Sequence, residues 1–184
     1  MPAMMPVFSP AQCVGYVAFI LGVTAFLQKN DRRLKFFNAS ECFVYTVHFV
    51  LLGNFPASAS SCISGVRSLL ALKIRSSSLA VLIIVINIAF GVALVKSPLG
   101  WLPVAASCAA TLAVFMLQGI PMRLVLLGST LCWLVNNIVS RSIGGTSLET
   151  VIAIVNTWTM IRMFLAKTEV QAASRRVAPL ENPS

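Results

Sequence analysis

Residues 57–75 read ASASSCISGVRSLLALKIR, an apolar segment rich in small residues with the charge of Arg67 near its middle and Lys73 and Arg75 at its end. Its length suits a helix that crosses about 30 Å of hydrocarbon. A guanidinium at that depth costs about 2.5–3.5 kcal/mol on insertion scales, so it is expected to face a partner, a wet cavity or a ligand. A second segment of this kind, residues 145–163, carries Asn156 near its middle. The two segments predict a polar site inside a membrane bundle.

The composition of the whole chain is typical of an integral membrane protein. Of its 184 residues 58% are hydrophobic and only 10% are charged, whereas soluble domains carry about 25% charged residues. The apolar runs are long enough for membrane-spanning helices, and the short alternating segments of a membrane β-barrel are missing from the sequence. We therefore predict an all-α, polytopic membrane protein.

Seven transmembrane helices can be placed, separated by turns that contain Pro, Gly or basic residues. The predicted spans are residues 12–28, 36–53, 57–72, 79–95, 101–118, 124–139 and 147–166. Together they form a single membrane domain, residues 1–166, and the polar residues 167–184 are expected to form a disordered tail. No Lys/Arg cluster precedes the first span, so we expect it to stay in the mature protein and not to act as a signal peptide.

The distribution of Lys and Arg predicts the orientation of the spans. Two basic residues, Lys96 and Arg141, fall on one side of the membrane. Eleven fall on the other, namely Lys29, Arg32, Arg33, Lys35, Lys73, Arg75, Arg123, Arg162, Lys167, Arg175 and Arg176. The side rich in basic residues is cytoplasmic, which places the N-terminus outside and the C-terminus inside. Because the net charge of +9 is explained in this way, the lipid bilayer is the expected partner and a nucleic acid is not.

An internal repeat is visible when the chain is shifted by about ninety residues. The aligned positions are 26–28 with 116–118, Arg33-Leu34 with Arg123-Leu124 and, after a further small shift, Arg67 with Asn156. Because the span at 79–95 separates the two copies, both have the same orientation in the membrane. We predict two parallel three-helix repeats, residues 12–75 and 101–166, joined by a linker helix.

Short pieces of sequence over residues 15–164 also resemble one protein family. They are NDRR at 30–33, HF at 48–49, LLG at 51–53, PA at 56–57, Arg67, LPV at 102–104, MR at 122–123, SIGGT at 142–146, Glu149, Asn156 and IR at 161–162. Together they resemble the YgjV-type family of bacterial inner-membrane proteins. The resemblance implies a multi-pass protein of the bacterial inner membrane and implies no substrate. The three-plus-one-plus-three architecture is also similar to that of SWEET sugar carriers and PnuC-type vitamin transporters, although both copies lack the proline-glutamine turn of PQ-loop proteins.

The candidate ligand-binding residues are the polar side chains within the predicted spans. They are Arg67, His48, Glu41, Tyr45, Trp133, Asn136, Asn137 and Asn156. Arg67 is expected either to face an anion in a central cavity or to serve as a structural arginine bonded to carbonyls or to a buried acid. The asparagines, with Trp133, suit either contacts between helices or a polar ligand.

One face of the second span gathers three of these candidates. Glu41, Tyr45 and His48 are spaced i, i+4, i+7, so they share that face. His48 is expected at the depth of Arg67, and Glu41 nearer the inner end, where it would neutralise Arg67 or carry a proton. The alternative is a polar face that satisfies itself inside the bundle. Glu149 is expected near the outer end of the last span, either wet or capping a helix.

The sequence contains no catalytic constellation, since it has one histidine and lacks a nucleophile elbow, an HExxH motif and a phosphate loop. Its five cysteines (Cys13, Cys42, Cys62, Cys108 and Cys132) lie in apolar segments without metal-ligand spacing. We therefore expect no enzyme activity, no cofactor and no metal. Two functions stay open. The first is a small transporter or facilitator for a small polar or anionic metabolite, which would pass between the repeats. The second is a non-transporting scaffold or sensor, and a homo-oligomer is compatible with either.

Overall fold

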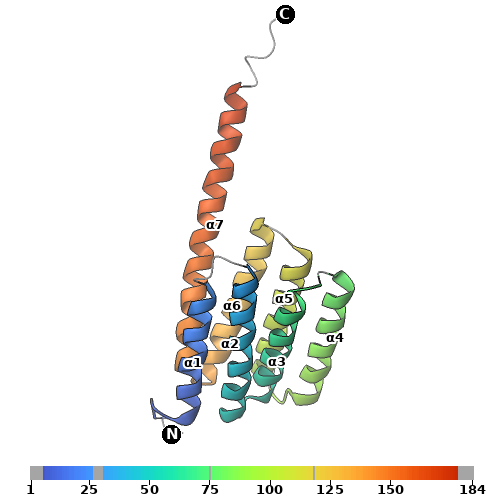
Figure 1. Cartoon of the computed structure of the whole chain (residues 1–184), viewed down its shortest axis with the longest axis vertical. Helices are drawn as coiled ribbons and strands as arrows, with labels where there is room; N and C mark the ends of the chain where they lie inside the picture. The colour runs from blue at the N-terminus through green and yellow to red at the C-terminus, as the bar shows by residue number, and fades with distance from the viewer. Residues whose placement is uncertain (1–5, 27–30, 75, 118, 178–184) are drawn as a thin grey trace, which may run out of the picture.

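The computed structural model describes residues 6–26, 31–74, 76–117 and 119–177 (Figure 1). The described residues form seven α-helices and one short 3-10 helix, and they contain no strand. The helices are α1 (Pro10–Phe26), α2 (Asp31–Leu51), α3 (Phe55–Leu70), α4 (Ser77–Leu94), α5 (Trp101–Met116), α6 (Gly119–Val139) and α7 (Ile143–Val177), with η1 (Pro98–Gly100) leading into α5. The predicted all-α fold and its seven helices are confirmed.

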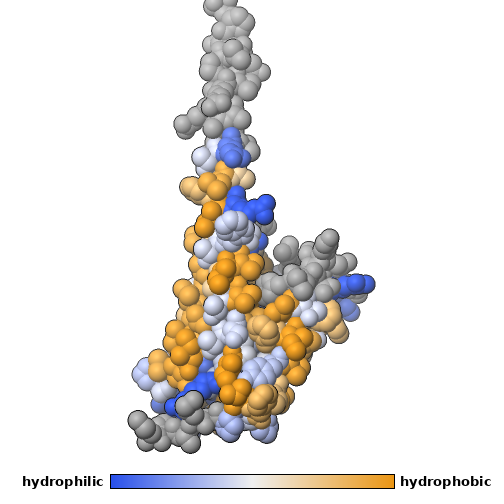
Figure 2. Space-filling view, turned by 90° about the vertical axis from the view of Figure 1, so that its left-hand side faces the viewer, coloured by the Kyte–Doolittle hydropathy of each residue, from blue (hydrophilic) through white to orange (hydrophobic). Residues whose placement is uncertain are grey.

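Within the described residues, four segments are long and apolar enough to cross a membrane: α4, Pro98–Met116, α6 and Ile143–Glu169 of α7. Helix α1 is apolar but shorter, α2 begins with charged residues, and α3 has only 16 residues. Figure 2 shows apolar residues over the middle of one face of the molecule, with hydrophilic residues above and below. This banding is typical of a bundle whose middle lies in hydrocarbon.

Six helices close into a ring around the site described below. Each helix packs on the next in the order α1, α2, α3, α5, α6, α7, and α7 returns to α1. Helix α4 packs outside this ring against α3 and α5, and most of its side chains are exposed, as expected for a helix surrounded by lipid. Successive helices run in opposite directions (Figure 1).

Small residues let the ring helices approach closely. All seven buried residues of α3 are alanine, serine or glycine. Helices α1 and α7 touch at Gly15 and Gly144, where a β-carbon on Gly144 would collide with the backbone carbonyl of Gly15. Gly22 makes room in the same way for Leu148 and for the carboxyl group of Glu41. Such contacts are the usual means by which membrane helices associate, since lipid supplies no hydrophobic force between them.

Several helix ends differ from the prediction. Helices α2 and α6 each begin five residues earlier than expected, at Asp31 and Gly119, and α7 begins four residues earlier, at Ile143. Helix α7 continues to Val177, so residues 167–177 are helical where we expected a disordered tail. This segment has the strong helix formers Ala, Lys, Gln, Glu and Arg and no proline before residue 179, so helix propensity extends the helix past the apolar run. Helix α3 ends at Leu70, which leaves Arg67 in its last turn and not in its middle. Residues 27–30, 75 and 178–184, with Lys29 and Arg75 of the basic side, lie outside the described residues.

Candidate functional site

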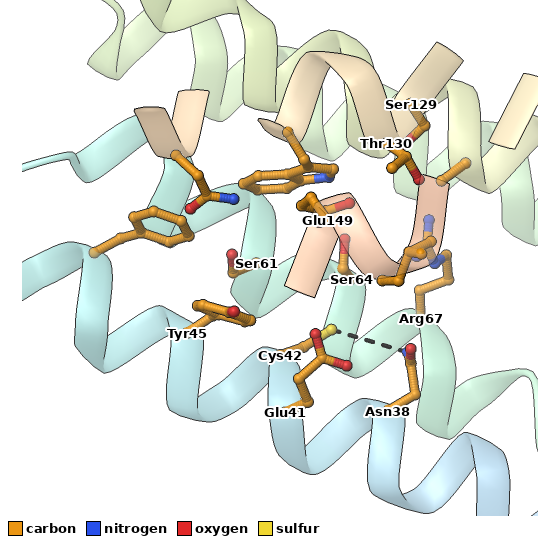
Figure 3. Close-up of a pocket in the computed structure, with 15 residues that line it drawn as sticks. Asn38, Glu41, Cys42, Tyr45, Ser61, Ser64, Arg67, Ser129, Thr130 and Glu149 are labelled. Carbon is orange, nitrogen blue, oxygen red and sulfur yellow. Dashed lines mark hydrogen bonds between the residues drawn. The ribbon is translucent and has the colours of Figure 1, made fainter. Parts of the chain in front are cut away.

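A cavity of about 140 Å³ lies inside the helix ring, between the first three helices and the last three (Figure 3). We call it the central cavity. Five helices of the ring supply its lining, which is polar and aromatic. The lining residues are Asn38, Glu41, Cys42, Tyr45, Phe49, Ser61, Ser64, Arg67, Ala110, Ser129, Thr130, Trp133, Asn137, Glu149 and Ile152.

Two acids and one base line the central cavity, each from a different helix. Glu41 comes from α2, Arg67 from α3 and Glu149 from α7. The Arg67 guanidinium is held on α5, where its Nη1 donates to Thr111 Oγ1 at 3.0 Å and to the Ser107 carbonyl at 3.3 Å. In the described residues Arg67 forms no hydrogen bond or ion pair with Glu41 or His48, although such a contact was expected. Arg67 instead joins α3 to α5.

Two buried polar atoms of the lining have no hydrogen-bond partner in the described part of the chain. They are the hydroxyl of Tyr45 and Oδ1 of Asn137. The side chains are only 7% and 2% exposed, so bulk solvent does not reach them. A buried polar group without a partner costs about 1–3 kcal/mol. Such groups beside a cavity are typical of a site that completes its hydrogen bonds with a ligand or with water.

An aromatic wall covers one side of the central cavity. The rings of Tyr45 and Phe49 stack with centroids 5.7 Å apart, and those of Phe49 and Trp133 stack at 5.9 Å. Helix α2 supplies two of these aromatic side chains and α6 supplies the third. The wall therefore connects the two halves of the helix ring.

Hydrogen bonds close the lower end of the bundle in Figure 1, where α1, α3 and α7 begin. His48, in the last turn of α2, contacts the Ala11 carbonyl through Nδ1 and the Ser142 hydroxyl through Nε2, both at 2.7 Å. Asn54 Nδ2 donates to Asn136 Oδ1 at 2.9 Å and to Ser140 Oγ at 2.7 Å.

Gln12 completes this network from α1. Its amide nitrogen donates to the Arg141 carbonyl at 2.5 Å, and its amide oxygen accepts from the backbone nitrogen of Ile143 at 3.1 Å. The network therefore ties the first three helices to α6, α7 and the turn between them.

The opposite, upper end of the bundle holds a wider cavity of about 520 Å³. This upper cavity and the central cavity share part of their lining, namely Asn38, Arg67, Ala110, Ser129, Thr130 and Ile152. Arg123 and Asn156 line only the upper cavity, where Asn156 Nδ2 donates to the Arg123 carbonyl at 2.9 Å and Arg123 Nη1 donates to Asn156 Oδ1 at 3.2 Å. The polar interior of the bundle thus continues upward past Arg67.

Comparison with known proteins identifies the family. The family model described as "Bacterial inner membrane protein", Imp-YgjV, matches residues 9–167. The chain belongs to this family. Inner membrane protein YgjV of Escherichia coli (strain K12) is similar, with 37% identity over 154 residues that cover 84% of each chain. No solved structure matches the chain. The match to the family model confirms the resemblance seen in the sequence. It places the chain in the bacterial inner membrane as a multi-pass protein.

In this member of the Imp-YgjV family, the predicted site residues fall into three groups. Five line the central cavity, namely Glu41, Tyr45, Arg67, Trp133 and Asn137. His48 and Asn136 belong to the network at the lower end, and Asn156 lines the upper cavity. His48 is therefore not at the depth of Arg67: α2 and α3 run in opposite directions, and each residue lies in the last turn of its helix.

Sequence reasoning misplaced Glu149. It was expected at the wet outer end of the last span, but α7 begins at Ile143, and Glu149, in the second turn, lines the central cavity. The spacing of Glu149, Ile152 and Asn156 (i, i+3, i+7) could have found it, since this spacing puts the acid on the same helix face as the asparagine already singled out.

Proposed function

We propose that this protein is a small transporter or facilitator and that a small polar solute passes through the central cavity without being chemically changed. The supporting observation is the continuous polar interior. Charged side chains line a cavity between the two halves of the ring, and that cavity adjoins the wider upper cavity at Arg67. Ionisable residues inside a membrane bundle usually mark a solute or ion path.

The two ends of the bundle support an alternating mode of access. The lower end is closed by the bonds of Gln12, His48 and Asn54, and its own cavities of about 420 and 440 Å³ share no lining residue with the central cavity. The upper cavity of about 520 Å³ does share part of that lining. We propose that this arrangement is the inward-facing state, with the upper end in the cytoplasm, where the positive-inside rule puts the C-terminus. Opening to the other side would then require these lower-end bonds to break.

Solute uptake by reconstituted vesicles tests the proposal. Purified protein in liposomes is given a metabolite extract, and the solutes retained are identified by mass spectrometry. We expect at least one small polar solute to enter wild-type vesicles and to enter vesicles with Glu149→Gln much more slowly. Equal retention by wild-type, Glu149→Gln and protein-free vesicles for every solute would contradict transport.

One feature favours a second function, a scaffold or sensor. Helix α7 continues to Val177, past the other helices (Figure 1), so its last turns are clear of the bundle and a partner can reach them. Removal of residues 168–184 separates the two functions. A transporter should keep its uptake after the truncation, because every residue of the central cavity precedes residue 168. A scaffold should lose its partner, measured by cross-linking in membranes, while its fold persists.

A further inference from the structure

We propose that the central cavity binds a small organic ammonium ion, a compound with one positively charged nitrogen. This inference rests on the proposed function, because it names the class of solute that the path would carry. It departs from the anionic solute that Arg67 alone suggests, since Glu149 also lines this cavity. Three features of the lining support it independently: its hydrogen-bond acceptors, its charge and its aromatic rings.

The strongest hydrogen-bond acceptors that the cavity offers to a ligand are two carboxyl groups. Those of Glu41 and Glu149 accept hydrogen bonds when ionised, and the buried Tyr45 hydroxyl has no partner in the described residues. Two of the lining donors are used elsewhere: Ser129 Oγ donates to the Ala106 carbonyl at 2.8 Å, and Asn38 Nδ2 donates to Ser68 Oγ at 2.9 Å. Such a lining suits a ligand that brings donors or positive charge.

The charges of the lining also favour a monovalent cation. With Glu41 and Glu149 ionised and Arg67 protonated, the three groups sum to one negative charge. Arg67 is anchored on α5 by Thr111 and the Ser107 carbonyl and forms no ion pair with Glu41 or Glu149 in the described residues, so both carboxyl groups are left for a ligand. Burying an unbalanced charge in a membrane is costly, and a bound monocation would remove the imbalance.

The aromatic wall supplies a third reason. A cation over the face of Trp, Tyr or Phe is attracted by the negative ring face, and aromatic cages recognise alkylated ammonium groups in this way. The rings of Tyr45, Phe49 and Trp133 line the same cavity as the two carboxylates. Tyr45 belongs to both sets, because its unpaired hydroxyl is also buried there (Figure 3). A cavity of about 140 Å³ sets the size of the ligand at a few non-hydrogen atoms.

Fluorescence of Trp133 measures the binding directly. The chain has three tryptophans, and Trp101→Phe with Trp158→Phe leaves only the one that lines the cavity. The purified variant in lipid nanodiscs is titrated with choline, with its neutral isostere 3,3-dimethylbutan-1-ol and with the anion 3,3-dimethylbutanoate. We expect a saturable change with choline, and binding of the alcohol and of the anion at least about tenfold weaker.

Substitutions in the same background identify the groups that bind. Glu41→Gln and Glu149→Gln should each weaken choline binding by about 10- to 100-fold, because each change removes a negative charge that attracts the quaternary ammonium. Tyr45→Phe should weaken it by roughly two- to tenfold. Because Tyr45→Phe removes an unpaired hydroxyl, it should not lower the melting temperature, which separates lost binding from lost fold. Glu169→Gln, on the exposed part of α7, is the matched control and should change nothing.

The possible results distinguish this inference from the transport proposal. Tighter binding of the anion than of choline, no binding of choline, or choline binding unaffected by both glutamine variants would overturn the ammonium site. Uptake of labelled choline into liposomes is measured on the same proteins. Choline binding by a protein whose vesicles take up neither choline nor any other solute would refute transport and leave the ammonium site standing. Uptake of other solutes by a protein that does not bind choline would refute the ammonium site and leave the transport proposal standing.

Discussion

At the scale of single residues, Arg67 combines two roles that the sequence could present only as alternatives. It lines both cavities, and it also bonds the hydroxyl of Thr111 and the backbone of α5. The sequence identified five residues of the central cavity, because polar side chains in apolar membrane helices are buried inside the bundle and do not face lipid. The sequence could not predict which of these residues contact each other, since their contacts depend on where each helix begins and ends.

Arg67→Met should lower the stability of the protein and the yield in membranes. The change removes two hydrogen bonds to a charged group, for which a loss of about 1.5–3 kcal/mol each is typical, and it leaves Glu41 and Glu149 without a nearby positive charge. We expect Glu149→Gln in the same chain to restore part of the yield. Thermal unfolding in detergent is the measurement, and an unchanged melting temperature for the single variant would contradict the anchoring role of Arg67.

His48→Ala should destabilise the lower end of the bundle and leave the central cavity intact. The change leaves the Ser142 hydroxyl and the Ala11 carbonyl without their 2.7 Å partner, and a buried unpaired group costs about 1–3 kcal/mol. Hydrogen exchange should speed up in residues 10–16 and 142–148. Equal acceleration around Arg67 would place His48 in a different part of the bundle from the one described.

At the scale of helices, the contact between α1 and α7 closes the ring. Gly144→Ala should disrupt it, because the added β-carbon would meet the backbone of α1 at Gly15, which cannot rotate away. Overpacking of this kind costs about 1–3 kcal/mol or more. Gly128→Ala on α6 is the control, since nothing lies within 4 Å of its β-carbon. We expect a lower melting temperature for Gly144→Ala alone, and equal melting of the two variants would argue against the close crossing.

The repeat also belongs to this scale and stays a prediction. The contacts around the helix ring are compatible with a two-fold relation in which α1 corresponds to α5, α2 to α6 and α3 to α7. Under this exchange the contact between α1 and α7 becomes the contact between α5 and α3, and both pairs of helices pack together. An experimental structure should superpose the two halves by a rotation about the membrane normal, with Arg67 and Asn156 near equivalent places. Halves related by inversion would contradict this.

At the scale of the whole molecule, composition predicted most of the fold. A chain that is 58% hydrophobic with helix-length runs has few alternatives to a helical bundle. The ends of the helices were harder to predict, since α7 continues through a polar segment that hydropathy alone reads as a tail. The position of Glu149 was missed for a different reason: the predicted start of the last helix was four residues too late, which put this side chain in the first turn and not in the second.

Orientation in the membrane is the next prediction at this scale. Reporter fusions should place the residues after Lys167 in the cytoplasm and the loop at Asn54 outside, because the basic residues gather on the cytoplasmic side. A cytoplasmic signal from a reporter at Ser142 would reverse the assignment of the upper and lower ends.

Access to Cys42 tests most directly whether solutes reach the central cavity from the cytoplasm. Cys42 lines this cavity, and the other four cysteines can be replaced by alanine so that it is the sole thiol. Vesicles of each orientation are treated with a membrane-impermeant trimethylammonium thiosulfonate, and labelling is followed by mass. We predict labelling from the cytoplasmic side that is slowed by choline, and far less labelling from the outside. A Cys42 thiol that reacts from neither side, yet reacts once the protein is unfolded, would mean a closed core and would contradict a solute path through the central cavity.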